Sequence, residues 1–261
     1  MPELPEVEHY RLYLQESALN QKIVSVETEN EGRMLKVPLA EIRDGSVGES
    51  FTDTDRIGKY LFLKSSGGKW LMWHFGLTGQ PVYYHGSSPP PKYQRILFRF
   101  DNGYQLAFAC LRKFGRLDLA DDVESYRIKN KIGQDAMHIP VADFVQALSK
   151  KRIAIKTALL QQKKFAGVGN WIADEMLFQT SLHPETPSNA HSPEQLAALH
   201  ESMQEIIATA ITEGGKQNFP DHYLVKVRKD GESCPTCETE LTRLVVGGRG
   251  TYICDRCQPG T

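Results

Sequence analysis

Residues 234–257, CPTCETELTRLVVGGRGTYICDRC, hold two Cys-X-X-Cys pairs, Cys234 with Cys237 and Cys254 with Cys257, separated by 16 residues. Four thiolates at this spacing complete a tetrahedral zinc site closed by a hairpin, and they leave no open position for a reacting water. The pattern therefore predicts one structural zinc ion and a zinc finger hairpin. Disulfide bonds are the alternative, which we set aside because the start of the chain has no secretion signal. The fifth cysteine, Cys110, lies in a strand-like segment and is expected in a core.

Within the finger, Arg249 lies between Gly248 and Gly250, at the expected tip of the hairpin. Zinc fixes such a tip, and glycine lets the backbone approach a ligand closely, so Arg249 is well placed to bind a phosphate. An ordinary exposed arginine of a turn is the alternative.

Upstream of the finger the pattern is helical from about residue 135. Gly167-Val168-Gly169-Asn170 precedes a helix expected over residues 170–180, and amides at a helix N-terminus form a cradle for phosphate. A helix-to-helix turn is the alternative. A longer helix is expected to begin after Ser192, with a capping box to Gln195, and to end at Gly214-Gly215. Basic residues that precede the glycine turn favour phosphate binding there; they are Lys150, Lys151, Arg152, Lys156, Lys163 and Lys164.

The N-terminal part begins with a short helix and continues as strands. Pro5 lies in the first turn of that helix, and Val7, Tyr10 and Leu14 share one face. Short segments rich in β-branched and aromatic residues follow, separated by turn residues, and their spacing predicts a β-sandwich of about 100 residues. The expected strands are 22–28, 60–64, 70–75, 96–100 and 104–109.

Composition describes a globular chain of 261 residues, 40% of them hydrophobic, with no apolar run of the roughly 20 residues that a membrane span needs. We expect a cytoplasmic protein that does not enter a membrane. The net charge is -1, but residues 91–170 hold 15 Lys and Arg against 7 Asp and Glu, whereas residues 171–213 hold no Lys or Arg and 7 acids. Such a division is typical of a protein with one basic face, or of two solvated faces of opposite sign.

The first residues offer a nucleophile. Removal of Met1 would expose the secondary amine of Pro2, with the carboxylates of Glu3 and Glu6 nearby in the sequence. An α-amino group has a pKa of about 7.7 to 8.0, so a useful fraction is unprotonated near neutral pH, and such an amine attacks aldehyde-level carbon. Helix-capping acids after a processed start are the alternative.

These features occur together in the order and approximate spacing of one family. The start PELPEVE, His74-Phe75-Gly76-Leu77-Thr78-Gly79, Arg112-Lys113-Phe114-Gly115, Gly167-Val168-Gly169-Asn170 and the Cys pairs resemble the formamidopyrimidine-DNA glycosylase / endonuclease VIII family, on its formamidopyrimidine branch. The resemblance implies an α+β multi-domain fold. It would comprise an N-terminal catalytic β-sandwich domain with a leading helix (1–130), a helix-two-turn-helix DNA-binding domain (131–220) and the zinc finger (221–261).

The resemblance also implies an activity, a bifunctional DNA glycosylase and AP lyase of base excision repair that works on double-stranded DNA containing oxidised bases or abasic sites. The chain would act as a monomer. Pro2 would attack C1′ and form a Schiff base, and Glu3 would be the acid/base, supported by Glu6. Lys59 would contact phosphate and assist β-elimination, and Arg249 would bind phosphate and assist δ-elimination.

Further positions match DNA-contacting residues of the family. Leu77, Arg112 and Phe114 would fill the gap left by the extruded nucleotide. His74, Lys151 and Asn170 would contact phosphates, and Tyr93 would replace a DNA-contacting histidine.

Departures from the family pattern bear on the substrate. Cys110-Leu111 stands in place of Asp-Pro, and Lys113 in place of an arginine. The stretch from Gly215 to Cys234 is about ten residues shorter than in members whose loop covers flipped 8-oxoguanine, so we expect 8-oxoguanine to be a weaker substrate than formamidopyrimidines, hydantoins or oxidised pyrimidines.

Two readings compete with the enzyme. One is a non-catalytic zinc-finger protein that binds damaged DNA or structured RNA. The other is a zinc-stabilised scaffold, which explains the cysteines but not the N-terminus.

Overall fold

The computed structural model describes residues 1–28, 32–214 and 218–260. The chain divides into two compact units, one formed by Met1–Pro2 and Glu6–Lys131, the other by Glu3–Pro5 and the chain from Ile132 onward. In the described residues, no helix is both long and apolar enough to cross a membrane.

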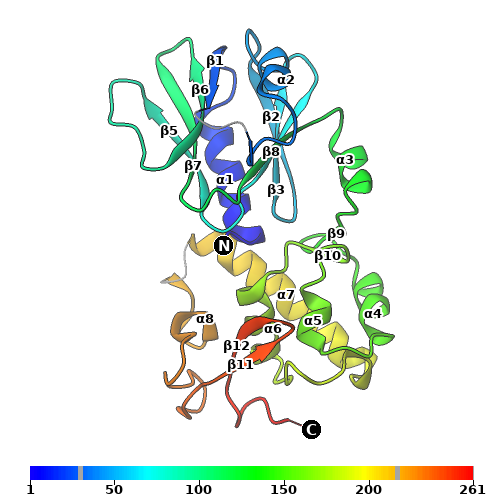
Figure 1. Cartoon of the computed structure of the whole chain (residues 1–261). Coiled ribbons are helices and arrows are strands. Elements are labelled where there is room, and N and C mark those ends of the chain that lie inside the picture. The colour runs from blue at the N-terminus through cyan, green and yellow to red at the C-terminus, as the bar shows by residue number, and fades with distance from the viewer. Residues whose placement is uncertain (29–31, 215–217, 261) are drawn as a thin grey trace. The chain divides into compact units, whose positions relative to one another are not determined.

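The first unit is a sandwich of two antiparallel four-stranded sheets, with strand orders β1-β6-β7-β5 and β2-β3-β4-β8 (Figure 1). The predicted β-sandwich with a leading helix is thus confirmed. Its strands are β1 (Ile23–Thr28), β2 (Phe51–Ile57), β3 (Tyr60–Ser65), β4 (Trp70–His74), β5 (Gly79–His85), β6 (Gln94–Phe100), β7 (Tyr104–Cys110) and β8 (Arg116–Ala120). Its helices are α1 (Leu4–Ser17), α2 (Leu39–Asp44) and α3 (Val123–Lys129), with Leu4 and Pro5 of α1 grouped with the second unit.

Aromatic side chains fill the space between the two sheets. Trp73 of β4 stacks on Phe98 of β6 and Phe108 of β7, with ring centroids 5.9 and 4.9 Å apart. Val7 and Leu14 of α1 are fully buried in the same cluster, as the shared face predicted. Burying each such side chain contributes about 1.5 to 3 kcal/mol, so α1 is held firmly against the sheets.

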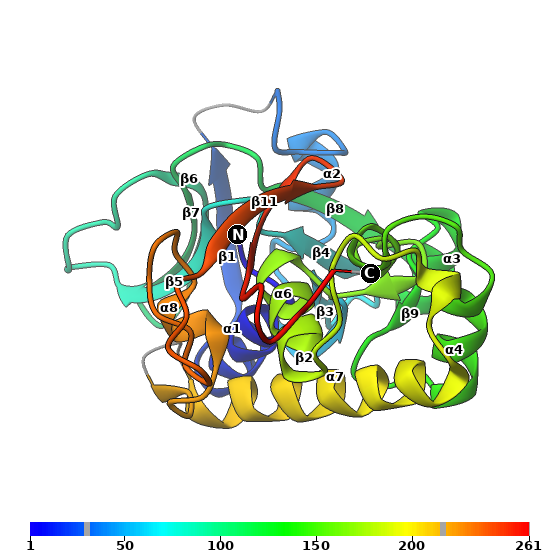
Figure 2. The ribbon, with the colours of Figure 1, turned by 90° about the horizontal axis from the view of Figure 1, so that it is seen from below.

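The second unit is mainly helical and carries the finger. Its elements are β9 (Gln134–Asp135), α4 (Val141–Ser149), α5 (Ile155–Leu159), β10 (Phe165–Ala166), α6 (Asn170–Gln179), the 3-10 turn η1 (Ser188–Ala190), α7 (Pro193–Glu213), α8 (Leu224–Val227), β11 (Thr242–Val246) and β12 (Arg249–Ile253). Figure 2 shows α6 between the long helix α7 and the finger strands. Residues 171–178 of α6 are all buried, so this helix is the centre of the unit.

The sequence signals for the ends of α7 are confirmed. Ser192 caps the helix and forms the expected capping box with Gln195, and Gly214 ends it with a φ of 72°. Gly215, the second residue of the expected stop, lies outside the described residues. Because this φ is reached without strain by glycine, the chain leaves α7 at a defined point.

The finger hairpin has the predicted form. Strands β11 and β12 pair from Thr242 with Ile253 to Val246 with Arg249, and Gly247 and Gly248 form the turn with φ values of 57° and 73°. Two consecutive positive φ angles are the requirement of a tight two-residue hairpin turn. Arg249 is therefore the first residue after the tip.

Candidate active site and nucleic-acid interface

Glu3 caps the central helix of the second unit. Its side chain is buried, with the residue 3% exposed, and its two carboxylate oxygens accept hydrogen bonds from the amides of Trp171 (3.1 Å) and Ile172 (3.3 Å). These amides belong to the first turn of α6, whose own cap residue, Gly169, has no side chain to offer. A carboxylate at this helix end is stabilised by the amides and by the helix dipole. The structure therefore holds the acid directly after Pro2 in one fixed position.

Gly169 makes room for that carboxylate. A Cβ at Gly169 would lie 2.0 Å from the carboxyl carbon of Glu3, far inside van der Waals contact. The amide of Leu4 also donates to the carbonyl of Gly167 (3.3 Å). Two of the first-turn amides of α6 that were predicted to cradle a phosphate are thus bound by the Glu3 carboxylate instead.

Lys59 lies on a tight turn of the first unit. Gly58 and Lys59 connect β2 to β3, Gly58 with a φ of 56°, and Lys59 is only 8% exposed. Arg56 fixes this turn, because its guanidinium donates both to the carbonyl of Gly58 (3.2 Å) and to the carboxylate of Glu8 in α1 (2.8 Å). The lysine is presented by a rigid hairpin rather than by a loose surface strand.

His74 lies near Lys59 and is neutral at physiological pH. Burial, together with the charges of Arg116 and Lys59, lowers the pKa of His74 to about 4. Its Nδ1 accepts a hydrogen bond from the amide of Gly76 (3.2 Å), so the proton resides on Nε2. A neutral ring with Nε2–H is a hydrogen-bond donor suited to a phosphate oxygen.

The predicted gap-filling residues come from two loops of the first unit. The amide of Arg112 donates to the hydroxyl of Thr78 (3.1 Å), which joins the 75–79 loop to the 111–115 loop. Gly76, with a φ of 60°, permits a close approach, since a Cβ there would lie 2.5 Å from the Phe114 carbonyl. Phe114 is 36% exposed and Leu77 is half-buried, so neither is an ordinary core residue.

Two arginines flank the exposed ring of Phe114. The guanidinium carbons of Arg33 and Arg112 lie 4.9 and 5.3 Å from the ring centroid. Such cation-π contacts orient the ring and concentrate positive charge beside it. Arg33 was not predicted, because nothing in its local sequence distinguishes it from other surface arginines.

Tyr93 and Cys110 meet at a strand end of the same unit. Tyr93 is 50% exposed, and its carbonyl accepts from the amide of Cys110 (2.9 Å). Cys110 is fully buried, which confirms it as a core residue.

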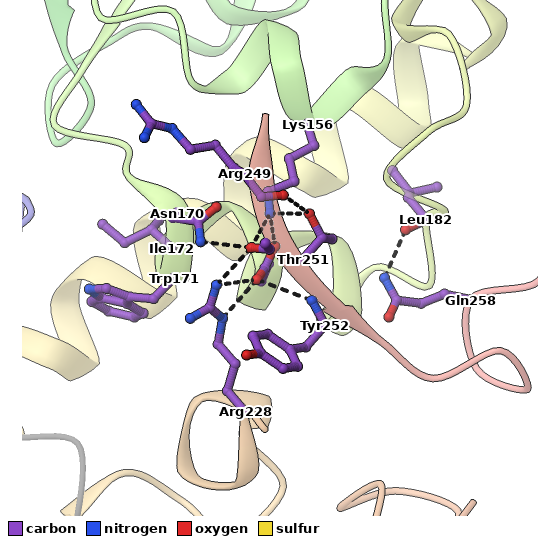
Figure 3. A network of polar contacts seen from close by, with 12 residues as sticks. Lys156, Asn170, Trp171, Ile172, Leu182, Arg228, Arg249, Thr251, Tyr252 and Gln258 are labelled. Atoms are coloured by element: carbon purple, nitrogen blue, oxygen red, sulfur yellow. Dashed lines mark hydrogen bonds and ion pairs between the residues drawn. The ribbon is translucent and has the colours of Figure 1, made fainter. Parts of the chain in front are cut away.

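In the second unit Asn170 binds the backbone of β12 beside Arg249. The side-chain amide of Asn170 donates to the carbonyl of Gly250 (2.8 Å), the residue that follows Arg249. The Arg249 side chain is exposed and points away from these contacts (Figure 3). Lys151 is half-buried and lies two residues after the end of α4.

Lys156 differs from the other basic residues before the glycine turn. It is fully buried, and burial lowers its pKa against the opposing effect of Asp174, whose Oδ1 lies 2.5 Å from the Lys156 Nζ. The prediction that Lys156 helps to bind a phosphate at the surface is therefore wrong, because its ammonium forms a buried ion pair with Asp174. Asp174 and its second partner Arg228 were missed, although two adjacent acids within the apolar run 171–178 are a signal for buried carboxylates.

The four finger cysteines form the predicted metal site. Their sulfur atoms lie within 4.8 Å of one another, with Cys234 to Cys257 at 3.8 Å and Cys237 to Cys254 at 3.4 Å. Tetrahedral zinc with bonds of about 2.3 Å separates its sulfur ligands by roughly 3.8 Å, whereas a disulfide needs about 2.05 Å. The cluster fits one structural zinc ion, and disulfide bonds do not fit it.

Glu175 holds the segment that leads into the finger. Its carboxylate accepts from the amides of Leu224 (3.1 Å) and Val225 (2.7 Å), and burial raises its pKa. Phe219 and Tyr223 of this segment are buried and stacked, with centroids 5.3 Å apart. Lys216 and Gln217, which belong to the stretch predicted to be short, lie outside the described residues.

Family models match nearly all of the chain. The formamidopyrimidine-DNA glycosylase N-terminal domain matches residues 1–117, the formamidopyrimidine-DNA glycosylase H2TH domain matches residues 132–220, and the zinc finger found in FPG and IleRS matches residues 231–260. The H2TH match confirms the helix-two-turn-helix fold that the resemblance implied.

Curated relatives and solved structures agree. Formamidopyrimidine-DNA glycosylase of Streptococcus thermophilus is 31% identical over 273 residues, covering 99% of each chain, and that of Streptococcus pyogenes is 33% identical, covering 99% of this chain and 98% of the relative. Lactococcus lactis Fpg bound to abasic-site DNA superposes with a TM-score of 0.90 at 31% identity, and MutM bound to carbocyclic 8-oxo-G DNA with 0.91 at 32%, each covering 99% of this chain and 100% of the other. The chain belongs to the formamidopyrimidine-DNA glycosylase family.

Proposed function

We propose that this protein is a bifunctional DNA glycosylase and AP lyase of base excision repair. The observation that carries the proposal is the buried Glu3 carboxylate, which two α6 amides hold in place directly after Pro2. A protein that only binds DNA has no need of a fixed acid beside an N-terminal imino group. Structures of Lactococcus lactis Fpg with abasic-site DNA and with Fapy-dG DNA, similar over 99% of this chain, support the same substrate class.

In the proposed reaction Pro2, exposed by removal of Met1, attacks C1′ of the damaged nucleotide. The glycosidic bond breaks, the base leaves, and Glu3 transfers a proton as the sugar ring opens to a Schiff base. Glu6 supports this site. Burial, together with the negative charge of Glu6, raises the pKa of Tyr10 to about 12.

Strand cleavage follows by two eliminations. Loss of a proton from C2′ breaks the C3′–O bond, and Lys59 assists this step. Loss of the C4′ proton then passes its electron pair through the conjugated iminium, so that the C5′–O bond breaks and the phosphate leaves with the pair. Arg249 stabilises that departing phosphate, since a guanidinium forms strong charge-assisted bonds with phosphate oxygens.

Other residues hold the duplex and the extruded nucleotide. We assign phosphate contacts to His74, Lys151 and Asn170, and a further DNA contact to Tyr93. Leu77, Arg112 and Phe114 occupy the gap, where an apolar wedge offsets lost stacking and an arginine bonds the orphaned base. The catalytic domain would be residues 1–130, the helix-two-turn-helix domain 131–220 and the zinc finger 221–261, acting as a monomer in the cytoplasm on chromosomal DNA.

Incubation with a duplex containing one abasic site tests the proposal. The chain from which Met1 has been removed is expected to cut the strand and leave phosphate at both ends of the gap. Tight binding without strand scission would instead favour the non-catalytic zinc-finger protein.

Gly169→Ala is expected to slow base excision about 100-fold, because its Cβ would occupy the place of the Glu3 carboxyl carbon. Gly45→Ala is the control, since its Cβ would have no neighbour nearer than 3.4 Å and its φ of -84° suits alanine. Single-turnover excision of formamidopyrimidine from a duplex measures the effect. A Gly169→Ala rate equal to that of the control would contradict this placement of Glu3.

We expect excision of 8-oxoguanine opposite cytosine to be at least about tenfold slower, by kcat/KM, than that of formamidopyrimidine in the same sequence, the size of a few lost contacts. The described part of the segment after α7 packs within its own unit. Phe219 and Tyr223 are buried, and the amides of Leu224 and Val225 donate to the Glu175 carboxylate. Little chain remains to cover a flipped purine. Comparable turnover on both lesions would overturn the prediction.

A further inference from the structure

A buried ion network lies directly behind the strand that carries Arg249. Asp174 of α6 pairs through Oδ1 with the Lys156 ammonium (2.5 Å) and through Oδ2 with Arg228, whose Nε and second terminal nitrogen lie at 2.7 and 2.6 Å. The side chains of Lys156 and Asp174 are fully buried, and that of Arg228 is 17% exposed. The amide of Tyr252 in β12 also donates to Oδ2 (3.4 Å).

Three side chains of this region converge on one carbonyl oxygen, that of Gly250. Asn170 donates to it at 2.8 Å, Lys156 at 3.3 Å and Arg228 at 3.4 Å. A peptide oxygen has two lone pairs, so three donors, two of them cationic, hold this peptide from several directions. Gly250 directly follows Arg249, and Figure 3 shows Asn170, Arg228 and Lys156 around this part of β12.

A second set of bonds reaches the backbone of Arg249 itself. The hydroxyl of Thr251 accepts from Lys156 (2.6 Å) and donates to the Arg249 carbonyl (3.1 Å). The carbonyl groups of Arg249 and Gly250 are therefore both linked to the Lys156 ammonium, the first through Thr251 and the second directly. The Arg249 guanidinium points away from these bonds, toward solvent (Figure 3).

A buried ion network stabilises a fold less well than apolar packing does, because its charges must be removed from water. Burying two cations and one carboxylate carries a desolvation cost that mutual attraction offsets only with good geometry, and apolar packing would join the finger to α6 as well. Apolar packing, however, does not fix the position and orientation of a single peptide group. The network therefore points to fine positioning of the hairpin tip.

We propose that Arg228, acting through Asp174, is a positioning residue that sets the tip of β12 so that the Arg249 guanidinium meets the phosphate leaving in the second elimination. This inference rests on the proposed function and deepens it. The β-elimination would need the network less, because its proton transfer and its leaving group do not depend on Arg249.

The test compares the two elimination products from an abasic-site duplex. Arg228→Gln removes the charge and the fork, whereas Arg228→Lys keeps the charge alone. Lys226→Gln is the matched control, because it removes a cation two residues away that pairs with the exposed Asp221 (2.5 Å). Zinc content and affinity for a duplex with an uncleavable tetrahydrofuran site are measured for every variant.

We expect Arg228→Gln to lower the ratio of δ- to β-elimination product about tenfold, the effect of one lost charge-assisted bond, while β-elimination stays within about twofold of wild type. Arg228→Lys should recover part of the ratio, and Lys226→Gln should leave it unchanged. Thr251→Val, nearly isosteric at a residue 1% exposed, should lower the ratio in the same direction without touching the ion pairs.

An unchanged product ratio in Arg228→Gln that retains zinc would overturn the inference. If Arg228→Gln loses zinc, Thr251→Val decides, and an unchanged ratio in that variant overturns it. A proportional fall of both eliminations would also overturn it, since that is the result of a merely structural role. Failure of the wild-type protein to cut the strand at all would instead refute the proposed function, so the two failures are distinguishable.

Discussion

Glu3→Gln is expected to slow base excision about 10²- to 10⁴-fold, the usual contribution of a positioned acid/base. The glutamine side chain is the same size, but it cannot give up a proton at the reacting sugar. It also accepts through one oxygen only, so its amino group would face one of the two amides, Trp171 or Ile172, that the carboxylate now satisfies. A loss of about 1 kcal/mol in the free energy of unfolding should accompany the change.

Single-turnover excision and thermal unfolding, measured on the same preparation, separate the two effects. Glu16→Gln is the matched control, because Glu16 is an exposed acid near the end of α1. The loss of rate should far exceed the loss of stability. A Glu3→Gln protein that excises bases within about twofold of wild type would remove Glu3 from the mechanism.

Removal of zinc is expected to abolish specific DNA binding, with a loss of at least about 100-fold in affinity. Metal binding supplies on the order of 10 to 16 kcal/mol to the folding of such fingers. The apolar cluster around the site is small, comprising Phe178, Leu224, Cys234, Leu241 and Cys254, and cannot hold the hairpin alone. Arg249 would lose its fixed position and with it the charge-assisted phosphate contact that we propose for it.

Cys237→Ala and Cys110→Ala distinguish this effect from the general loss of a thiol. Cys237 is a ligand of the cluster, whereas Cys110 is buried in the sandwich. The first variant should lose the metal and the affinity for an abasic-site duplex, and the second should keep one zinc per chain and bind normally. Normal binding by a zinc-free preparation would contradict the structural role of the metal.

How well each strand could be predicted follows its place in the sheets. The five strands expected from the sequence were all found, with ends within about two residues, and four of them, β3, β4, β6 and β7, are central. The strands of the sandwich that were missed, β2, β5 and β8, are all edges. An edge strand buries less, so β2 reads as alternating charges and β5 tolerates Pro81, and neither shows the apolar run of a central strand.

The site shows a similar division. Features that depend on neighbours in sequence, such as the Cys pairs and the Ser192 cap, were predicted with their residues, and the tip of the finger hairpin was predicted to within about two residues. The ion network was not, because its three members are far apart in the chain. Lys156 and Arg228 look like surface charges in the sequence, and the apolar run around Asp174 indicates burial but not its partners. Only the folded chain brings the three side chains together behind β12, and a buried charge is recognisable once its partners are known.

Borohydride trapping on an abasic-site duplex identifies the residue that forms the Schiff base. The protein is prepared with Met1 removed, reduced on the DNA and digested, and the cross-linked peptide is identified by mass. We expect a covalent adduct at the nitrogen of Pro2, absent when Met1 is retained. No adduct from correctly processed protein bound to the duplex, or an adduct on Lys59 in place of Pro2, would contradict it.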